Sequence, residues 1–126
     1  MFDRRRTVIG MTAFPLTACA HLEKKASKMY GLIGTMTARP SKRAELAAIL
    51  LEGLRAMPGN LSYIVANDPA DTDKLWITEV WTDAESHLAS LKLPSVQAAI
   101  VKGRPMIAGM DRVAETRPFG GHGLTG

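Results

Sequence analysis

Glu79, Trp81 and His87 lie close together in the sequence, and their side chains could carry out proton transfer beside an aromatic ligand. The imidazole of His87 is suited to act as a general base because it is neutral near pH 7. Glu79, in an apolar strand, could take part in the same transfer. Two simpler interpretations stay open. His87 could be a packed or half-exposed surface residue, and Glu79 could form an ion pair with Arg104 or Arg117 or a contact across a dimer.

Aromatic and amide side chains near this block could bind a flat ligand. Trp76 and Trp81 have opposite parity in one strand, so at most one of them can face a given pocket, and Trp81 is the preferred candidate. Tyr63 and Asn67 could donate hydrogen bonds to a phenolate. Asn67 precedes Asp68-Pro69 and could instead be a turn residue.

No motif for a metal or an organic cofactor is found. His21, His87 and His122 are far apart, and no cysteine joins them at metal-ligand spacing. The glycine cluster near residue 121 ends the chain instead of opening a helix, so it does not resemble a phosphate-binding loop. The sequence also lacks the usual patterns of a serine or cysteine nucleophile.

Residue patterns predict four strands and three helical segments in the domain that must position these side chains. We expect strands at 30–38, 60–67, 75–82 and 110–117, and helices at 42–57, from Asp83 onward and from Pro94 onward. Ser41 is expected to cap the first helix, and Thr82 with Glu85 resembles a capping box for the next. In that helix the predicted apolar stripe is Ala84, Leu88 and Leu91.

The order strand, helix, strand, strand, helix, strand predicts an α+β, ferredoxin-like βαββαβ fold with helices on one face of a four-stranded antiparallel sheet. Both sides of the strand at 75–82 carry bulky side chains. An apolar sheet face of that size is seldom left in water, so we expect a homodimer that covers it.

The first twenty residues have the features of an export signal. Arg4, Arg5 and Arg6 precede the apolar run 7–18, and Arg5-Arg6-Thr7-Val8-Ile9 also resembles a twin-arginine pattern. The run ends in Leu16-Thr17-Ala18-Cys19, which resembles the lipobox of bacterial lipoproteins, so lipidation of Cys19 and a place in the cell envelope are expected. The alternatives are cleavage without lipid near the same position, or translation from Met29 and a cytoplasmic protein.

The remaining chain divides into a polar linker at 21–28, a domain at 29–118 and a glycine-rich tail at 119–126. The composition, 46% hydrophobic and 22% charged, is that of an ordinary globular protein. The net charge of +4 falls to about +2 without residues 1–18, because three arginines and one aspartate leave with them. A nucleic-acid partner is therefore not expected.

Three segments together resemble the antibiotic biosynthesis monooxygenase domain family, which includes quinol monooxygenases. They are Met57-Pro58-Gly59-Asn60-Leu61-Ser62-Tyr63, Trp76-Ile77-Thr78-Glu79-Val80-Trp81 and Leu93-Pro94-Ser95-Val96, and the likeness covers roughly residues 29 to 118. The resemblance implies a dimeric α+β barrel with a pocket between sheet and helices in each subunit. It also implies oxidation of a quinol, an anthrone or a similar aromatic by dioxygen without metal or flavin.

The sequence departs from the family at one place. Ser90 and Ser95 stand where histidines are often found, and the axial histidine of haem-degrading relatives has no counterpart. Two hypotheses follow: a cofactor-independent monooxygenase of the cell envelope that acts on a quinol-like or polycyclic aromatic, or a non-catalytic dimer that binds a small molecule or has a structural role. A pocket that joins Trp81, Glu79 and His87, with Glu79 unpaired, would favour the enzyme.

Overall fold

The computed structural model describes residues 28–124. In chain order its elements are β1 (Tyr30–Ala38), α2 (Arg43–Gly53), β2 (Asn60–Asn67), β3 (Lys74–Trp81), α3 (Ala84–Ser90), α4 (Pro94–Gly103), the 3-10 helix η1 (Arg104–Met106) and β4 (Ile107–Thr116). The signal peptide, most of the polar linker and the lipid attachment site at Cys19 fall outside the described residues, so they stay predictions.

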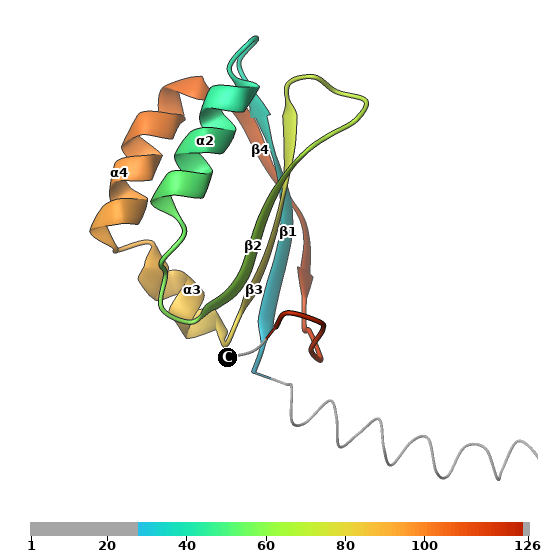
Figure 1. Ribbon diagram of the computed structural model, residues 1–126, viewed down its shortest axis with the longest axis vertical. Helices are drawn as coiled ribbons and strands as arrows, with labels where there is room; N and C mark the ends of the chain where they lie inside the picture. The colour runs from blue at the N-terminus through green and yellow to red at the C-terminus, as the bar shows by residue number, and fades with distance from the viewer. Residues whose placement is uncertain (1–27, 125–126) are drawn as a thin grey trace, which may run out of the picture.

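The four strands form one antiparallel sheet in the order β2-β3-β1-β4, and α2, α3 and α4 all lie on one side of it (Figure 1). The predicted ferredoxin-like fold is confirmed. The two central strands, β1 and β3, pair in a register that sets Leu32 opposite Glu79 and Gly34 opposite Ile77. Side chains of one parity in β1 and β3 therefore point together toward the helices.

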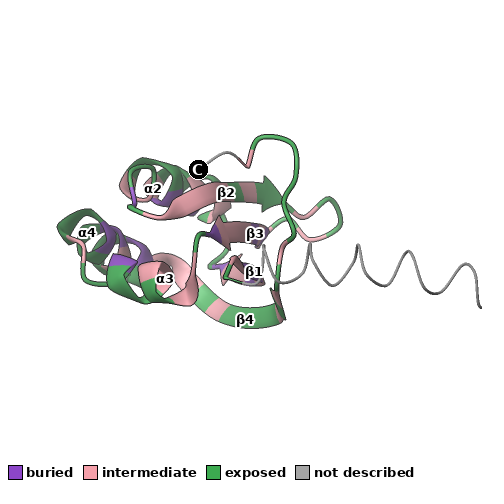
Figure 2. Cartoon of the chain, turned by 90° about the horizontal axis from the view of Figure 1, so that it is seen from below, coloured by how far each residue is buried: buried purple, intermediate pink, exposed green. Residues whose placement is uncertain are grey.

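The core fills the layer between the sheet and the helices. Leu75, Ile77 and Trp81 of β3 are buried on this inner face, as alternation predicted, and Trp81 is only 1% exposed. Figure 2 shows the buried parts of the helices on the side that faces the strands. The core has two clusters. In the first, the buried strand residues Ala38, Leu75 and Ile77 pack with Leu46 and Leu50 of α2. In the second, the buried residues Met57, Trp81 and Val96 pack together near the start of β2.

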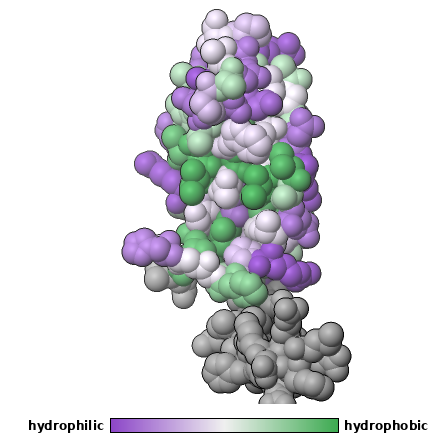
Figure 3. Space-filling view, turned by 90° about the vertical axis from the view of Figure 1, so that its right-hand side faces the viewer, coloured by the Kyte–Doolittle hydropathy of each residue, from purple (hydrophilic) through white to green (hydrophobic). Residues whose placement is uncertain are grey.

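The outer face of the sheet is apolar and, within residues 28–124, carries no helix. Ile64 of β2 and Ile33 of β1 both lie opposite Thr78 on this face, and Ile64 is 55% exposed. Figure 3 shows hydrophobic side chains gathered across the middle of this side of the molecule. This surface is therefore a candidate for contact with another protein surface.

The first helix is shorter than predicted. Ser41 does not cap it, because its φ of 71° places it in the left-handed region, and Lys42 occupies the N-cap position without a side-chain hydrogen bond. The helix ends at Gly53, not at Met57. A Cβ atom at Gly53 would lie 2.6 Å from Cβ of Ala99, so the absence of a side chain lets α2 approach α4 closely.

The predicted capping box at Thr82 and Glu85 is wrong by one residue. Oδ1 of Asp83 accepts a hydrogen bond from the backbone N–H of Ser86 at 2.7 Å, and α3 begins at Ala84. Hydrogen bonding to Ser86 holds the pKa of Asp83 below its ordinary value. The Thr82 hydroxyl lies 3.3 Å from that of Ser86 instead.

The predicted apolar stripe of α3 is not its buried face. Leu88 is 62% exposed and Leu91, just after the helix, is 43% exposed, whereas Ser90 is buried. The helix has only seven residues, and Ser90 is its one buried residue.

The fourth strand begins at Ile107, three residues earlier than expected, and bulges interrupt its pairing with β1.

None of the helices formed by the described residues is both long enough and apolar enough to cross a membrane.

Candidate functional site

A cavity of about 410 Å³ lies between the inner face of the sheet and the helices. This volume is in the range of small-molecule sites in proteins. Most of its wall is apolar and comes from the central strands and all three helices; this part of the lining includes Leu32, Met36, Leu50, Leu54, Met57, Ile77, Leu91, Val96, Ile100 and Met110. Such a wall suits a flat, largely apolar ligand.

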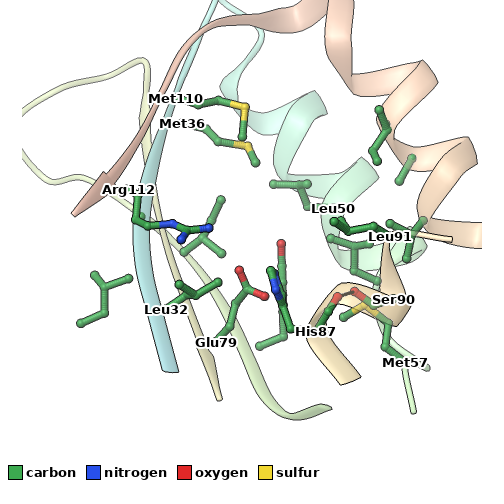
Figure 4. A pocket seen from close by; sticks show the side chains of 18 of the residues that line it. Leu32, Met36, Leu50, Met57, Glu79, His87, Ser90, Leu91, Met110 and Arg112 are labelled. Atoms are coloured by element: carbon green, nitrogen blue, oxygen red, sulfur yellow. Dashed lines mark hydrogen bonds between the residues drawn. The ribbon is translucent and has the colours of Figure 1, made fainter. Parts of the chain in front are cut away.

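A few polar side chains interrupt the apolar wall, and they come from different elements. Glu79 comes from β3, His87 from α3, Arg112 from β4 and Tyr63 from β2. Figure 4 shows Glu79, His87 and Arg112 directed into the space between the sheet and the helices. The cavity therefore combines a carboxyl group, an imidazole, a guanidinium and a phenol around an apolar interior.

Glu79 is held by an indole and forms no ion pair within residues 28–124. Its Oε1 accepts a hydrogen bond of 2.9 Å from Nε1 of Trp81, two residues along the same face of β3. The salt bridges among the described residues do not include Glu79, so the alternative ion pair with Arg104 or Arg117 is not observed. A contact across a dimer is untested. One carboxylate oxygen is thus fixed, while the other has no hydrogen-bond donor among these residues.

His87 is held between two aromatic rings. Its ring centroid lies 5.5 Å from that of Tyr30, at 42° between planes, and 5.4 Å from that of Trp81, at 74°. The hydroxyl of Ser90 donates a hydrogen bond of 2.6 Å to the backbone oxygen of His87. These contacts give the imidazole a defined position at the cavity, unlike that of a free surface residue.

Tyr63 is a neutral phenol in this environment. Burial raises the pKa of its hydroxyl group, and the nearby charge of Glu79 raises the same pKa further. The phenol therefore keeps its proton well above neutral pH, so it remains able to donate a hydrogen bond to a ligand oxygen.

Two of the predicted binding residues do not reach the cavity. Trp76 has the opposite parity to Trp81 and lies on the outer face, where its Nε1 donates a hydrogen bond of 2.7 Å to Oδ2 of Asp68. Asn67 is exposed at the end of β2, next to the turn that follows. The structure thus brings together His87, Glu79, Trp81 and Tyr63, and leaves Trp76 and Asn67 outside.

Sequence reasoning did not find Arg112. Alternation in β4 contained the signal, because Met110 and Arg112 have the same parity and pair with Met36 and Gly34 on the inner face. That signal can be read only once β4 is known to pair with β1.

In the part of the chain that is described, no three His, Cys, Asp or Glu side chains lie close enough together to hold a metal ion.

The chain belongs to the antibiotic biosynthesis monooxygenase family, because the family's sequence model matches residues 29–102. The predicted resemblance is confirmed. No protein with a curated description matches the chain.

Solved structures share this fold. A protein from Chloroflexus aurantiacus J-10-fl, provisionally described as an antibiotic biosynthesis monooxygenase, is 62% identical; the match has a TM-score of 0.74 and covers 77% of this chain and 99% of the other. A protein from Caulobacter crescentus CB15 with the same provisional description is 19% identical, with a TM-score of 0.66, and the match covers 72% of this chain and 90% of the other.

SnoaB, a cofactor-independent oxygenase from Streptomyces nogalater, is 13% identical to this chain. The TM-score is 0.62, and the match covers 72% of this chain and 93% of SnoaB. At this identity the likeness concerns the fold alone.

Proposed function

We propose that this protein is a cofactor-independent monooxygenase that oxidises a quinol-like or polycyclic aromatic molecule with dioxygen. The observation that carries the proposal is the meeting of His87, Glu79 and Tyr63 at one apolar cavity. Membership of the antibiotic biosynthesis monooxygenase family supports it. The oxygenase activity described for SnoaB, which has the same fold, is consistent with it.

The first step is removal of a proton from the substrate. His87 is the base in this proposal, because a neutral imidazole is matched to pH 7 and the ring is fixed between Tyr30 and Trp81. Glu79 shares in the proton transfer through its oxygen that does not bind Trp81. Tyr63 donates a hydrogen bond to the oxygen on which negative charge develops.

The aromatic anion then passes one electron to dioxygen, and the resulting radicals combine to form a carbon–oxygen bond. For an anthrone, cleavage of the oxygen–oxygen bond leaves one oxygen atom as the new carbonyl group. The second oxygen atom leaves as water with the two hydrogens of the original methylene carbon. The substrate supplies the electrons, and the protein supplies the base, the shape and the polar groups.

Oxygen uptake tests this proposal. The purified protein is given a panel of quinols and hydroxyanthrones, with autoxidation subtracted, and compared with His87→Asn and Glu79→Gln. Loss of a general base commonly lowers kcat by roughly 10²-fold or more. Matched controls are His122→Asn and Glu85→Gln, because neither residue lines the cavity. Saturable uptake that falls in the cavity variants and not in the controls supports the proposal; equal rates in all five proteins contradict it.

A non-catalytic binding protein is the second candidate. The observation in its favour is that the Trp81 indole is buried and already bonded to Glu79, as in a stable packed core. Saturable ligand binding without oxygen uptake above autoxidation, across the whole panel, would select this candidate.

We also propose that two copies of the chain associate through the outer sheet face. The support is the apolar surface around Ile33 and Ile64, which within residues 28–124 has no covering element. Light scattering after size exclusion should give twice the chain mass for the parent. Ile64→Lys should shift the protein toward the monomer, whereas the control Leu51→Lys, an exposed residue of α2, should not. A monomeric parent at micromolar concentration would contradict this proposal.

A further inference from the structure

Arg112 is the one lysine or arginine among the described residues that line the cavity. It belongs to β4, one of the two edge strands of the sheet, and it extends into the space opposite α3 (Figure 4). Since arginine keeps its charge at every ordinary pH, this position carries a permanent positive charge at the border of an apolar cavity.

The hydrogen-bond donors of Arg112 are not used within residues 28–124. Its nearest acidic group is Oε1 of Glu115, at 3.8 Å from Nη1, which is too long for a hydrogen bond. Glu115 instead accepts a hydrogen bond of 3.2 Å from the hydroxyl of Tyr30. Arg43 behaves differently, because it donates hydrogen bonds of 3.2 and 2.8 Å to two backbone oxygens of the loop after β2. Arg43 is structural, whereas Arg112 forms only a long, exposed ion pair with Glu115, so its hydrogen-bond donors are available to a ligand.

The sheet leaves room next to Arg112 for a ring. Arg112 pairs with Gly34, and Gly34 pairs with Ile77, so the three residues form one row across the inner face. A Cβ atom at Gly34 would meet only one neighbouring heavy atom within 4 Å, the backbone oxygen of Asp111. No other side chain therefore lies within 4 Å of that position, and Gly34 itself lines the cavity.

We propose that Arg112 is an anion-binding subsite of this cavity, and that the ligand is a planar aromatic molecule with a carboxylate group. The guanidinium binds the carboxylate at the edge strand, and the ring lies over Gly34 toward His87. The inference rests on the proposed function in one respect, that the cavity is the ligand site. It adds the charge of the ligand and its orientation in the cavity.

A carboxylate fits Arg112 better than an isolated phenolate does. The guanidinium offers two parallel N–H groups, and a carboxylate accepts both through two oxygens in one plane. Two neighbouring hydroxyl groups on a ring, when ionised, present a similar pair of oxygens. The experiment therefore compares both kinds of ligand.

Binding of quinones that do not consume oxygen tests the inference independently of catalysis. The probes are anthraquinone-2-carboxylate, its neutral 2-hydroxymethyl analogue and 1,2-dihydroxyanthraquinone, each titrated into the full-length protein by calorimetry. The parent should bind the carboxylate about 10-fold more tightly than the neutral analogue, a moderate preference because the Arg112 side chain is 60% exposed. Loss of oxygen uptake would count against the proposed function alone, since these affinities do not depend on turnover.

Arg112→Gln should remove the carboxylate preference, and Arg112→Lys should retain only part of it, because lysine keeps the charge and loses the planar pair of donors. Glu115→Gln should increase the preference, since a competing carboxylate is removed. Arg104→Gln is the matched control: it lies in η1, outside the cavity, and should leave the ratio unchanged. Melting curves verify that each variant is folded.

Several results would overturn the inference. They are equal affinity of the parent for the carboxylate and its neutral analogue, an unchanged ratio in Arg112→Gln, and failure of the parent to bind any of the three quinones. A preference for the dihydroxy compound alone would also overturn it, because the group recognised would then not be a carboxylate.

Discussion

Strand β3 carries two indoles, one on each face of the sheet, and each donates a hydrogen bond to a carboxylate. The two carboxylates differ in how many of their oxygens still have no donor. On the outer face Trp76 donates to Oδ2 of Asp68, while Oδ1 of Asp68 accepts two backbone N–H groups, each at 2.8 Å. On the inner face Trp81 donates to Oε1 of Glu79, and that is the one hydrogen bond of this carboxylate among the described residues. Both oxygens of Asp68 therefore accept hydrogen bonds in the loop, whereas only one oxygen of Glu79 does so at the cavity.

The difference separates a structural role from a chemical one. Asp68 has its acceptor positions occupied by the turn it stabilises, and these hydrogen bonds, first that from Trp76, keep its pKa below the ordinary value. Glu79 is oriented by one donor and still presents an oxygen to the cavity. An indole beside a carboxylate is therefore not a signature of a site by itself. The number of carboxylate acceptor positions without a donor distinguishes a structural pair from a pair at a candidate site.

The largest expected effect is on stability. Trp81→Ala should lower the free energy of unfolding by about 3–5 kcal/mol, because it empties a fully buried position, whereas Trp76→Ala on the outer face should cost about 1 kcal/mol. Urea unfolding of both variants measures the contrast. Equal losses would show that the two indoles contribute alike to the core.

The next effect is on turnover. Trp81→Phe keeps a ring in the core and removes the N–H that holds Glu79, so kcat should fall by roughly 10-fold to 100-fold with little change in KM. Trp76→Phe is the control, and its rate should equal that of the parent. A larger loss in the Trp76 variant would reverse the assignment of the two faces.

The third effect concerns acid stability and Asp68. Because the folded protein lowers the pKa of Asp68, its carboxylate contributes stability above the unfolded pKa of about 3.9. That contribution is lost as the pH falls through the lower folded pKa. The melting temperature of the parent should therefore exceed that of Asp68→Asn near neutral pH, and the gap should close below about pH 4. A gap that widens in acid would contradict the assignment.

The smallest effect is electrostatic and lies within the cavity. Glu79→Gln should lower the pKa of Tyr63, because the Glu79 charge is the second cause of its elevation; burial, the first cause, keeps the pKa above the ordinary value. Glu115→Gln is the matched control: it should lower the pKa of Tyr30 and leave that of Tyr63 unchanged, whereas Glu79→Gln should move Tyr30 less, because Glu115 is the larger cause there. NMR titration of the two tyrosine rings distinguishes them. An unmoved Tyr63 would show that Glu79 does not act across the cavity.

Local patterns predicted the elements, but not the ends of the helices. Composition and the stop at Arg39-Pro40 located β1 with its observed bounds, and alternation located β2 with its own, since a half-buried strand marks both of its faces in the sequence. The end of α2 depended on tertiary detail, because Gly53 must accommodate Ala99 of another helix. The start of α3 was misassigned by one residue because Thr82 and Asp83 are adjacent and both can cap a helix; Asp83 does so through Ser86.

The candidate site was predictable where one strand contains the information. Glu79 and Trp81 share a face of β3, and alternation alone excluded Trp76 from that face. Arg112 was missed because its approach to the cavity depends on the register between β4 and β1, which are far apart in the sequence. Asn67 has suitable chemistry, but it lies at an exposed strand end away from the cavity.

The edge position of β4 has an evolutionary consequence. Met110 and Arg112 contact the cavity and yet remain exposed, so substitutions there remove little buried surface. Trp81, by contrast, is fully buried, so its replacement by a small side chain would empty part of the core. Substitution can therefore alter the charge and shape of the cavity through two positions of one border strand, while the need for a stable fold keeps the opposite wall constant.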